Sequence, residues 1–419
     1  MNYKEIQKCR ICWNNNLVSI LNLGNQFLTG AFPRSKEQKI TCGPLELVKC
    51  QGSDSCGLVQ LRHSYEHREL YGENYGYRSG LNQSMVRHLH HIVERIMKLV
   101  SISSGDLVID IGSNDSTLLQ AYPQNGPILI GIDPVGEKFK EYYPDYVQLI
   151  PDFFSAKIVK DSFGEKRAKV ATSIAMFYDL ENPLDFMRQV YDILADDGIW
   201  VFEQSYMPAM LEKTAYDTVC HEHLEYYRLK QIKWMTDRAG FKIIDIELNN
   251  VNGGSFCVTA AKKSSSFQES SGLIEKLLEE EENKGLNTLK PYEKFKQRVY
   301  KHREDLVQFI QKIKADNKKI FGYGASTKGN VILQFCNITD RDIPFIAEIN
   351  KDKFGCFTPG TYIPIISEEE AKTMKPDYFL VLPWHFKENF LQREREYLKK
   401  GGMLLMPLPE IEVTRNQGY

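Results

Sequence analysis

Apolar residues recur at helical spacing in some stretches of the chain and form short continuous runs in others. Residues 84–100 carry apolar side chains three or four positions apart, which predicts an amphipathic helix. The runs 107–111 and 128–132 are followed directly by a glycine and an aspartate, and each predicts a buried strand. A third run, 319–323, follows a long helical pattern over 291–316. Strand and helix patterns that alternate in this way are typical of an α/β fold.

Length and composition describe an ordinary globular chain. At roughly 150 residues per domain, the 419 residues predict two or three domains. The 53 basic residues nearly balance the 55 acidic ones, which argues against a nucleic-acid or anionic-membrane partner, since no broad basic field exists. There is no apolar run of about 18 residues and no signal-peptide pattern at the start, so we expect a cytoplasmic protein.

Cysteines are concentrated at the beginning of the chain, where five of the nine lie within the first 56 residues. Cys9 and Cys12 form a C-x2-C knuckle, and Cys50 and Cys56 form a second, wider pair. Four thiolates at such spacing favour a structural Zn²⁺ site, which would hold together a segment with few core residues. Cys42 is an alternative ligand for one member of the second pair, and incidental free thiols are the other interpretation.

The loop after these cysteines is rich in glycine and tyrosine. Tyr75, Tyr77 and Arg78 lie in it and could present phenol and guanidinium groups to an oxygen-rich ligand. A packed aromatic turn is the alternative, and the residues alone favour neither.

The strand at 107–111 leads into a short turn and an apolar helix start at Leu118. Only one glycine is present, which argues against the pyrophosphate of NAD or FAD. An acid after the second strand can accept both ribose hydroxyls. This arrangement resembles the S-adenosylmethionine (SAM) site of class I methyltransferases, and generic turns of a sheet are the alternative. The predicted cofactor residues are Asp110, Gly112, Asn114, Asp115, Asp133 and Phe153.

A Cys-His-Glu-His sequence follows the predicted cofactor fold at Cys220–His223. The H-E-x-x-H spacing of zinc proteases is absent. General acid or base chemistry is the better interpretation, because imidazole titrates near neutrality and Glu222 can orient or balance it. A structural pair of histidines, His221 and His223, remains the alternative.

A second strand, glycine loop and helix start lie in the last third of the chain, around Tyr323, Ser326 and Lys328. Backbone amides and one cation could bind a phosphate there, although the ATPase P-loop pattern is absent and a plain tight turn is the alternative. Between the two regions, the glutamates at 279–282 favour a solvated helix face. Trp384 is predicted to be core, and the role of His385 is left open.

The chain as a whole resembles the sugar C-methyltransferases that act on nucleotide-linked 4-keto-6-deoxyhexoses, typically at C3. Six motifs in the same order carry the resemblance: the cysteine knuckles with 43–45 and 56–60, the loop at 75–80, 110–115, 220–223, 252–255 and 322–329. The resemblance implies a zinc-binding domain at 1–82, a Rossmann-like SAM domain at 83–262 and a Rossmann-like α/β domain for the substrate nucleotide at 263–419.

The resemblance also implies roles for individual residues. His223 would remove the C3 proton, assisted by Glu222 and by Tyr75 or Tyr77, with His221 beside them. The substrate would meet Arg78, Tyr178, Cys220, Tyr323, Ser326, Lys328, Glu348 and Asn350. Two departures stand out: Cys220 replaces a tyrosine that is frequent in the family, and Met176 or Tyr178 replaces a histidine.

The resulting hypothesis is a SAM-dependent C-methyltransferase with a structural zinc, acting on a GDP- or dTDP-linked 4-keto-6-deoxy sugar, as a monomer or homodimer. An O- or N-methyltransferase and a non-methylating sugar isomerase are alternatives on the same fold. A zinc-knuckle nucleic-acid-binding protein is an alternative of another class, which the balanced charge opposes.

Overall fold

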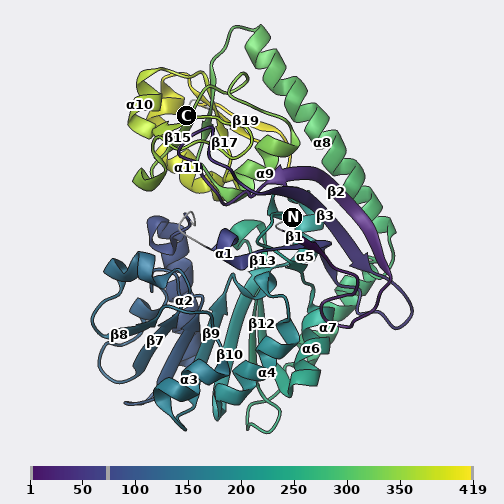
Figure 1. Ribbon diagram of the computed structural model, residues 1–419, viewed down its shortest axis with the longest axis vertical. Helices are drawn as coiled ribbons and strands as arrows, with labels where there is room; N and C mark the ends of the chain where they lie inside the picture. Colours follow the sequence, from purple (N-terminus) through teal and green to yellow (C-terminus); the bar gives the residue numbers. More distant parts are fainter. Residues whose placement is uncertain (1–2, 72–75, 417–419) are drawn as a thin grey trace.

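The computed structural model describes residues 3–71 and 76–416, so the predicted assisting residue Tyr75 lies outside the described residues. In sequence order the chain forms an N-terminal sheet, a central domain and a C-terminal domain. In space the N-terminal sheet lies between the other two (Figure 1). A two-stranded antiparallel ribbon of β1 (Tyr3–Glu5) and β5 (His63–Tyr65) accompanies the N-terminal sheet.

The central domain is built on a seven-stranded sheet in the order β12-β13-β10-β9-β6-β7-β8. Its strands are β6 (Leu107–Ile111), β7 (Ile128–Ile132), β8 (Val147–Ile150), β9 (Ala168–Ile174), β10 (Leu194–Ser205), β12 (Phe241–Asn249) and β13 (Ser255–Lys262). The predicted strands at 107–111 and 128–132 are confirmed as β6 and β7. Strand β13 is antiparallel to both neighbours, and the order reverses between β6 and β9, where α/β sheets bind ligands.

The prediction of a helix that begins at Leu118 is wrong, since only a 3₁₀ turn forms at Leu119–Ala121. Asn114 and Ser116 have positive φ angles of 51° and 63°, so the backbone coils left-handedly before any helix begins. Pro123 follows the turn and restricts its continuation. The glycine turn therefore presents a looped backbone, without an α-helix N-terminus, to its ligand.

Helices cover both faces of the central sheet. The predicted helix at 84–100 is confirmed as α2 (Gln83–Leu99), and its apolar stripe packs on one face. The other face is covered by α3 (Ala156–Phe163), α4 (Pro183–Ile193) and α6 (Leu229–Ala239). A short helix, α5 (Met207–Glu212), leads from β10 toward the His-Glu-His segment.

The N-terminal sheet takes a strand from the middle of the chain. Its order is β11-β4-β3-β2, with β2 (Leu17–Phe27), β3 (Cys42–Cys50), β4 (Val59–Leu61) and β11 (Glu225–Tyr226). Glu225, which lies two residues beyond His223, pairs with Gln60 of β4. The His-Glu-His segment therefore continues directly into the N-terminal sheet, and the boundaries 1–82, 83–262 and 263–419 stay a prediction.

The N-terminal sheet shares its core with the C-terminal domain, so the expectation of a segment short of core residues is wrong. Leu21, Leu45 and Leu47 belong to one buried cluster with Val299 and Ile332. The α9 (Thr327–Phe335) side chains also bond to the backbone of the N-terminal segment: Gln334 accepts from the amide of Phe27 at 2.8 Å, and Asn330 donates to the carbonyl of Thr29 at 2.8 Å.

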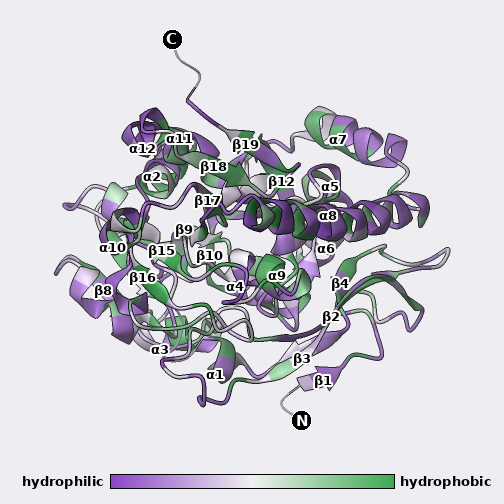
Figure 2. Cartoon of the chain, turned by 90° about the horizontal axis from the view of Figure 1, so that it is seen from above, coloured by the Kyte–Doolittle hydropathy of each residue, from purple (hydrophilic) through white to green (hydrophobic). Residues whose placement is uncertain are grey.

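The C-terminal domain has a six-stranded sheet in the order β16-β15-β14-β17-β18-β19. Its strands are β14 (Ile320–Tyr323), β15 (Ile346–Glu348), β16 (Ile365–Ser367), β17 (Tyr378–Val381), β18 (Met403–Met406) and β19 (Glu412–Thr414). The helical pattern at 291–316 is confirmed as α8 (Lys290–Ala315). Helix α9 is largely hydrophobic and lies in the interior, whereas α8 is mostly hydrophilic (Figure 2). The remaining helices are α10 (Glu368–Thr373), α11 (Lys387–Arg393) and α12 (Arg395–Lys399).

One glutamate of the run at 279–282 contradicts the expected solvated face. Glu281, on α7 (Ser271–Asn283), is 1% exposed. Its carboxylate accepts from the amides of Leu229 and Lys230, at 2.6 and 3.2 Å, and from the Tyr206 hydroxyl at 3.0 Å. Glu281 therefore satisfies the free amides at the start of α6 and joins that helix to α7.

Candidate active site and zinc centre

Cys9, Cys12, Cys50 and Cys56 bring their four sulfur atoms within 4.8 Å of one another. The Cys9–Cys56 and Cys12–Cys50 sulfurs lie 3.5 Å apart. A tetrahedral zinc with Zn–S bonds of about 2.3 Å separates its sulfurs by about 3.8 Å, so this geometry fits the metal. All four positions are taken by cysteine, which makes the zinc structural.

The structure decides against Cys42 as a ligand. Cys42 begins β3 and is exposed, while Cys50 ends the same strand and lies in the cluster. The amide of Leu58 and the side chain of Asn14 donate to ligand sulfurs, each at 3.4 Å. Such second-shell donors stabilise thiolate charge and orient the ligands.

Buried residues connect the zinc centre to the His-Glu-His segment. Arg10, between the first two ligands, lies 3.7 Å from the carboxylate of Glu225, and both side chains are almost fully buried. On the second knuckle, the carbonyl of Cys56 accepts from the Gln231 side chain at 2.7 Å. The metal-held loops therefore pack directly against the segment that follows His223.

The glycine turn after β6 needs glycine at its first position. Gly112 has a φ of +77°, and an added Cβ would lie 3.0 Å from Cγ of Met176. At the end of β7, Asp133 accepts from the amides of Asn114 and Val135, both at 2.8 Å. Asp133 thereby fixes the turn beside it, while its carboxylate oxygens keep the capacity to accept ribose hydroxyls. These residues fit the adenosyl part of SAM.

Asp110 lies deeper than a direct cofactor contact requires. It is 3% exposed, and it accepts from the Thr172 hydroxyl at 2.6 Å. Burial raises the pKa of Asp110 to about 7, with the Thr172 hydrogen bond opposing the shift and the charge of Asp133 adding to it. Asp110 therefore joins β6 to β9 beneath the turn. Phe153, which was predicted to flank the adenine, follows β8 and is 48% exposed.

Asn114 and Asp115 hold the N-terminal loop over the glycine turn. The Asn114 side chain accepts from the amide of Ser79 at 2.9 Å and donates to the carbonyl of Tyr77 at 3.1 Å. Asp115 accepts from the amide of Gly80 at 2.8 Å. The structure thus brings Tyr77 to the SAM turn, where its side chain is 46% exposed.

Arg78 follows Tyr77 in the same loop. Its guanidinium stacks on the ring of Tyr142 at 3.9 Å. Its predicted contact with the substrate stays a prediction.

One ring nitrogen of His223 is hydrogen-bonded to the backbone, which fixes the orientation of the imidazole. Its Nδ1 lies 2.9 Å from the carbonyl of Thr218, so Nδ1 carries the proton and Nε2 has the lone pair. Burial lowers the pKa of His223 to about 3, and the nearby Lys328 ammonium adds to this. The ring packs against Tyr178 with centroids 4.3 Å apart. His223 is therefore a neutral, oriented imidazole at physiological pH.

Glu222 faces the N-terminal segment. Its carboxyl accepts from the Thr29 hydroxyl at 3.4 Å, and an added Cβ at Gly30 would lie 2.3 Å from Oε1. Burial raises the pKa of Glu222. The carbonyl of Thr218 accepts from the Nδ1 of His223, and an assisting role of Glu222 stays a prediction.

Cys220 and His221 are fully buried. Both are 0% exposed. Burial raises the pKa of the Cys220 thiol, which lies against Glu222, and the His221 ring packs edge-on against Tyr65 at 4.6 Å. Direct substrate contact by Cys220 and direct catalysis by His221 are therefore corrected: both residues belong to the core beneath His223.

The loop before α9 is held by side chains on both sides. Ser326 accepts from the amide of Gly329 at 3.0 Å as the N-cap of α9. The amide of Ala325 donates to Glu348 at 2.6 Å, and its carbonyl accepts from Lys353 at 2.7 Å. Much of the predicted phosphate-binding backbone is therefore already hydrogen-bonded.

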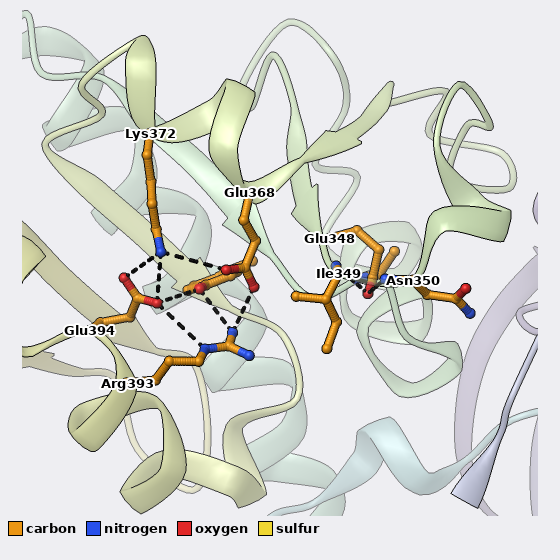
Figure 3. A network of polar contacts seen from close by, with 9 residues as sticks. Glu348, Ile349, Asn350, Glu368, Lys372, Arg393 and Glu394 are labelled. Atoms are coloured by element: carbon orange, nitrogen blue, oxygen red, sulfur yellow. Dashed lines mark hydrogen bonds and ion pairs between the residues drawn. The ribbon is translucent and has the colours of Figure 1, made fainter. Parts of the chain in front are cut away.

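Glu348 and Asn350 shape this end of the C-terminal sheet, and Figure 3 shows both. Glu348 also accepts from the amides of Ile349 and Asn350, at 2.7 and 2.9 Å. The side-chain amide of Asn350 donates to the carbonyl of Gly76 in the N-terminal loop at 3.4 Å. Glu348 is therefore a scaffold residue of the loop, while Asn350 reaches the neighbouring domain.

The prediction that Tyr323 contacts the substrate is wrong. Its hydroxyl donates to Glu394 at 2.6 Å and lies 2.8 Å from Arg393, and its side chain is 1% exposed. Arg393 and Lys372 also pair with Glu368, which closes the polar network shown in Figure 3. Tyr323 therefore joins β14 to the helices α10 to α12.

Sequence reasoning missed the contacts that join the C-terminal domain to the segment around His223. Trp384 donates to Asp217 at 2.7 Å, and Asp217 immediately precedes Thr218. Lys328 donates to the carbonyl of Asn252 at 2.9 Å. The segment 252–255 is one of the six motifs but has no predicted role, and nothing in the sequence predicts a role for Asp217 or Thr218.

Comparisons with known proteins agree with this arrangement along the whole chain. Three family models match in succession: a zinc binding domain at 9–71, a methyltransferase domain at 83–246 and a C-methyltransferase C-terminal domain at 250–409. The C-methyltransferase NovU of Streptomyces niveus is 29% identical over 413 residues, which cover 98% of this chain and 97% of NovU. The chain belongs to the SAM-dependent C-methyltransferases.

Solved structures resemble part of this C-methyltransferase. The CcbJ methyltransferase from Streptomyces caelestis is 13% identical, with a TM-score of 0.33, over 42% of this chain and 89% of CcbJ. The CurJ carbon methyltransferase is 16% identical, with a TM-score of 0.34, over 45% of this chain and 57% of CurJ. Within residues 3–71 and 76–416, no helix is long and apolar enough to cross a membrane.

Proposed function

We propose that this C-methyltransferase adds a methyl group to C3 of a nucleotide-linked 4-keto-6-deoxy sugar through an enolate. The observation that carries the proposal is the orientation of His223, whose Nδ1–H donates a hydrogen bond to the carbonyl of Thr218. A neutral imidazole with a fixed tautomer is suited to general-base catalysis through Nε2. A base is required because a carbon nucleophile, unlike an amine, must first lose a proton.

The proposed reaction begins with loss of a proton from the carbon beside the ketone. The C–H electron pair forms the enolate double bond, the carbonyl electron pair moves to oxygen, and His223 Nε2 takes the proton. Bound SAM supplies the electrophilic methyl group that the enolate carbon takes up. The Tyr178 ring packs at a tilt against the imidazole and limits its movement during the proton transfer.

Support for a nucleotide sugar comes from the resemblance of the six motifs and from the α/β architecture of the C-terminal domain. That domain ends its strands β14 and β15 near the N-terminal loop, where Asn350 meets Gly76. The nucleotide would lie at these strand ends, as ligands of α/β sheets do. Thymidine and guanosine diphosphates are the two forms to compare.

Solvent-deuterium exchange without SAM tests the chemistry. Incubation with a nucleotide-linked 4-keto-6-deoxy sugar in D₂O should label C3, and addition of SAM should increase the product mass by one methyl group. His223→Ala should slow both reactions by about 10²- to 10⁴-fold. Methylation without prior exchange would indicate an O- or N-methyltransferase, and exchange without methylation would indicate an isomerase.

A further inference from the structure

Four segments of the chain converge beside the base His223, and Lys328 of α9 lies among them. Its ammonium donates to the carbonyl of Asn252, in the turn between β12 and β13. Trp384 packs against that turn, since an added Cβ at Gly253 would lie 3.5 Å from its ring, and its indole donates to Asp217. Helix α9 packs directly on the turn at Tyr216–Thr218 that orients His223.

Hydrogen bonds already occupy part of the phosphate cradle that was predicted around Lys328. In the loop and first turn of α9, four amides are already paired: Gly324 with Ala347, Ala325 with Glu348, Gly329 with Ser326 and Asn330 with the Ser326 carbonyl. A phosphate site at a helix start depends on amides that are free to point at the ligand. The Lys328 ammonium instead reaches the central domain, where it donates to the carbonyl of Asn252.

A cation so close to a general base opposes proton uptake unless an anion comes between them. The charge of Lys328 contributes to the lowered pKa of His223. It also acts on Asp217 and Cys220, which lie beneath the base. Proton transfer from a carbon beside a ketone creates negative charge on the ketone oxygen, two bonds away from that carbon. The cation would then stabilise the charge that the base generates.

We propose that Lys328 is a catalytic residue whose ammonium pairs with the enolate oxygen formed when His223 takes the proton. This inference rests on the proposed function and replaces the predicted role of Lys328 at the diphosphate. The C–H pair becomes the carbon–carbon double bond, the carbonyl pair becomes the oxyanion beside Lys328, and the proton is held by His223 Nε2. Transfer of the methyl group restores the carbonyl, after which His223 returns its proton to water.

Lys328→Met tests the inference, with the exposed Lys351→Met in the same domain as the matched control. We expect Lys328→Met to slow SAM-free deuterium exchange at saturating substrate by about 10²- to 10³-fold. Binding of thymidine or guanosine diphosphate without sugar should change by less than about threefold. The acidic limb of the exchange rate against pH should also move to higher pH, because a positive charge beside His223 is lost.

The outcomes separate the two proposals. If the wild type neither exchanges nor methylates any 4-keto nucleotide sugar, the proposed function fails. If the wild type exchanges and Lys328→Met exchanges as fast, only the role of Lys328 is refuted. A loss of about tenfold or more in diphosphate affinity would instead make Lys328 a phosphate ligand and overturn the inference. Melting temperatures of both variants within about 3 °C of the wild type verify that the fold is retained.

Discussion

His221 makes the stability of this enzyme depend on pH in a way that one substitution can isolate. Its imidazole is 0% exposed and packs edge-on against Tyr65. Burial lowers the pKa of His221 to about 3, and the nearby backbone of Gly43 and Gln26 only partly opposes this. The unfolded chain, by contrast, takes up a proton on this ring near pH 6.5.

The sign and size of the effect follow from linkage. Between pH 6.5 and pH 3 the unfolded state binds a proton on His221 that the native state does not, so stability falls as the pH falls. At pH 5, which lies 1.5 units below the unfolded pKa, the loss is about 2 kcal/mol. Above the unfolded pKa the neutral His221 ring costs no stability. The loss in the free energy of unfolding reaches its full size below pH 3, where both states bind the proton.

His221→Phe keeps an aromatic ring of similar shape and removes the titrating group. Urea unfolding followed by tryptophan fluorescence gives the free energy of unfolding at pH 7 and at pH 5. Its decrease between these two pH values should be about 2 kcal/mol smaller in His221→Phe than in the wild type. His91→Phe is the control, because that side chain is 53% exposed and remains hydrated in the folded protein. Equal losses in His221→Phe and the wild type would refute the proposed burial of the neutral ring.

Three further predictions concern the zinc centre, a helix cap and the SAM turn. Cys56→Ser should reduce bound zinc, measured by atomic emission, from about one per chain to near zero, while Cys42→Ser should retain it. Glu281→Ala should lower the free energy of unfolding in urea by about 1–2 kcal/mol, because the first amides of α6 lose their acceptor. Gly112→Ala should weaken S-adenosylhomocysteine binding by about tenfold in calorimetry; Gly105→Ala, also at positive φ but with nothing within 4 Å, should leave binding unchanged.

Local patterns in the sequence predict the elements of the central sheet well. Strands β6 and β7 match the apolar runs at 107–111 and 128–132, because strands buried on both faces need continuous apolar side chains. The Cys9–Cys12 knuckle is equally local, and its partners were limited to a few cysteines. The choice between Cys42 and Cys50 required the structure, since the two lie at opposite ends of one strand.

Roles that depend on distant contacts could not be predicted in the same way. Tyr323 lies in a motif that favours ligand binding, yet Glu394 and Arg393, about 70 residues later, draw its hydroxyl into a buried network. Thr218 carries no chemical signal at all, because it is the backbone carbonyl that orients His223. Any residue could have supplied that carbonyl, so only the path of the chain identifies it.

The borrowed strand β11 and the shared core have a consequence for the order in which this chain folds during synthesis. The two zinc knuckles are complete once residue 56 has left the ribosome, and the metal can close them early. The sheet beside them has to wait for Glu225–Tyr226 and then for α9, which ends at Phe335. At about 5–20 residues per second, that delay is roughly 15–55 s. During this interval the apolar face of β2 and β3 is uncovered, and zinc is what holds the nascent segment in a form that its later partners can recognise.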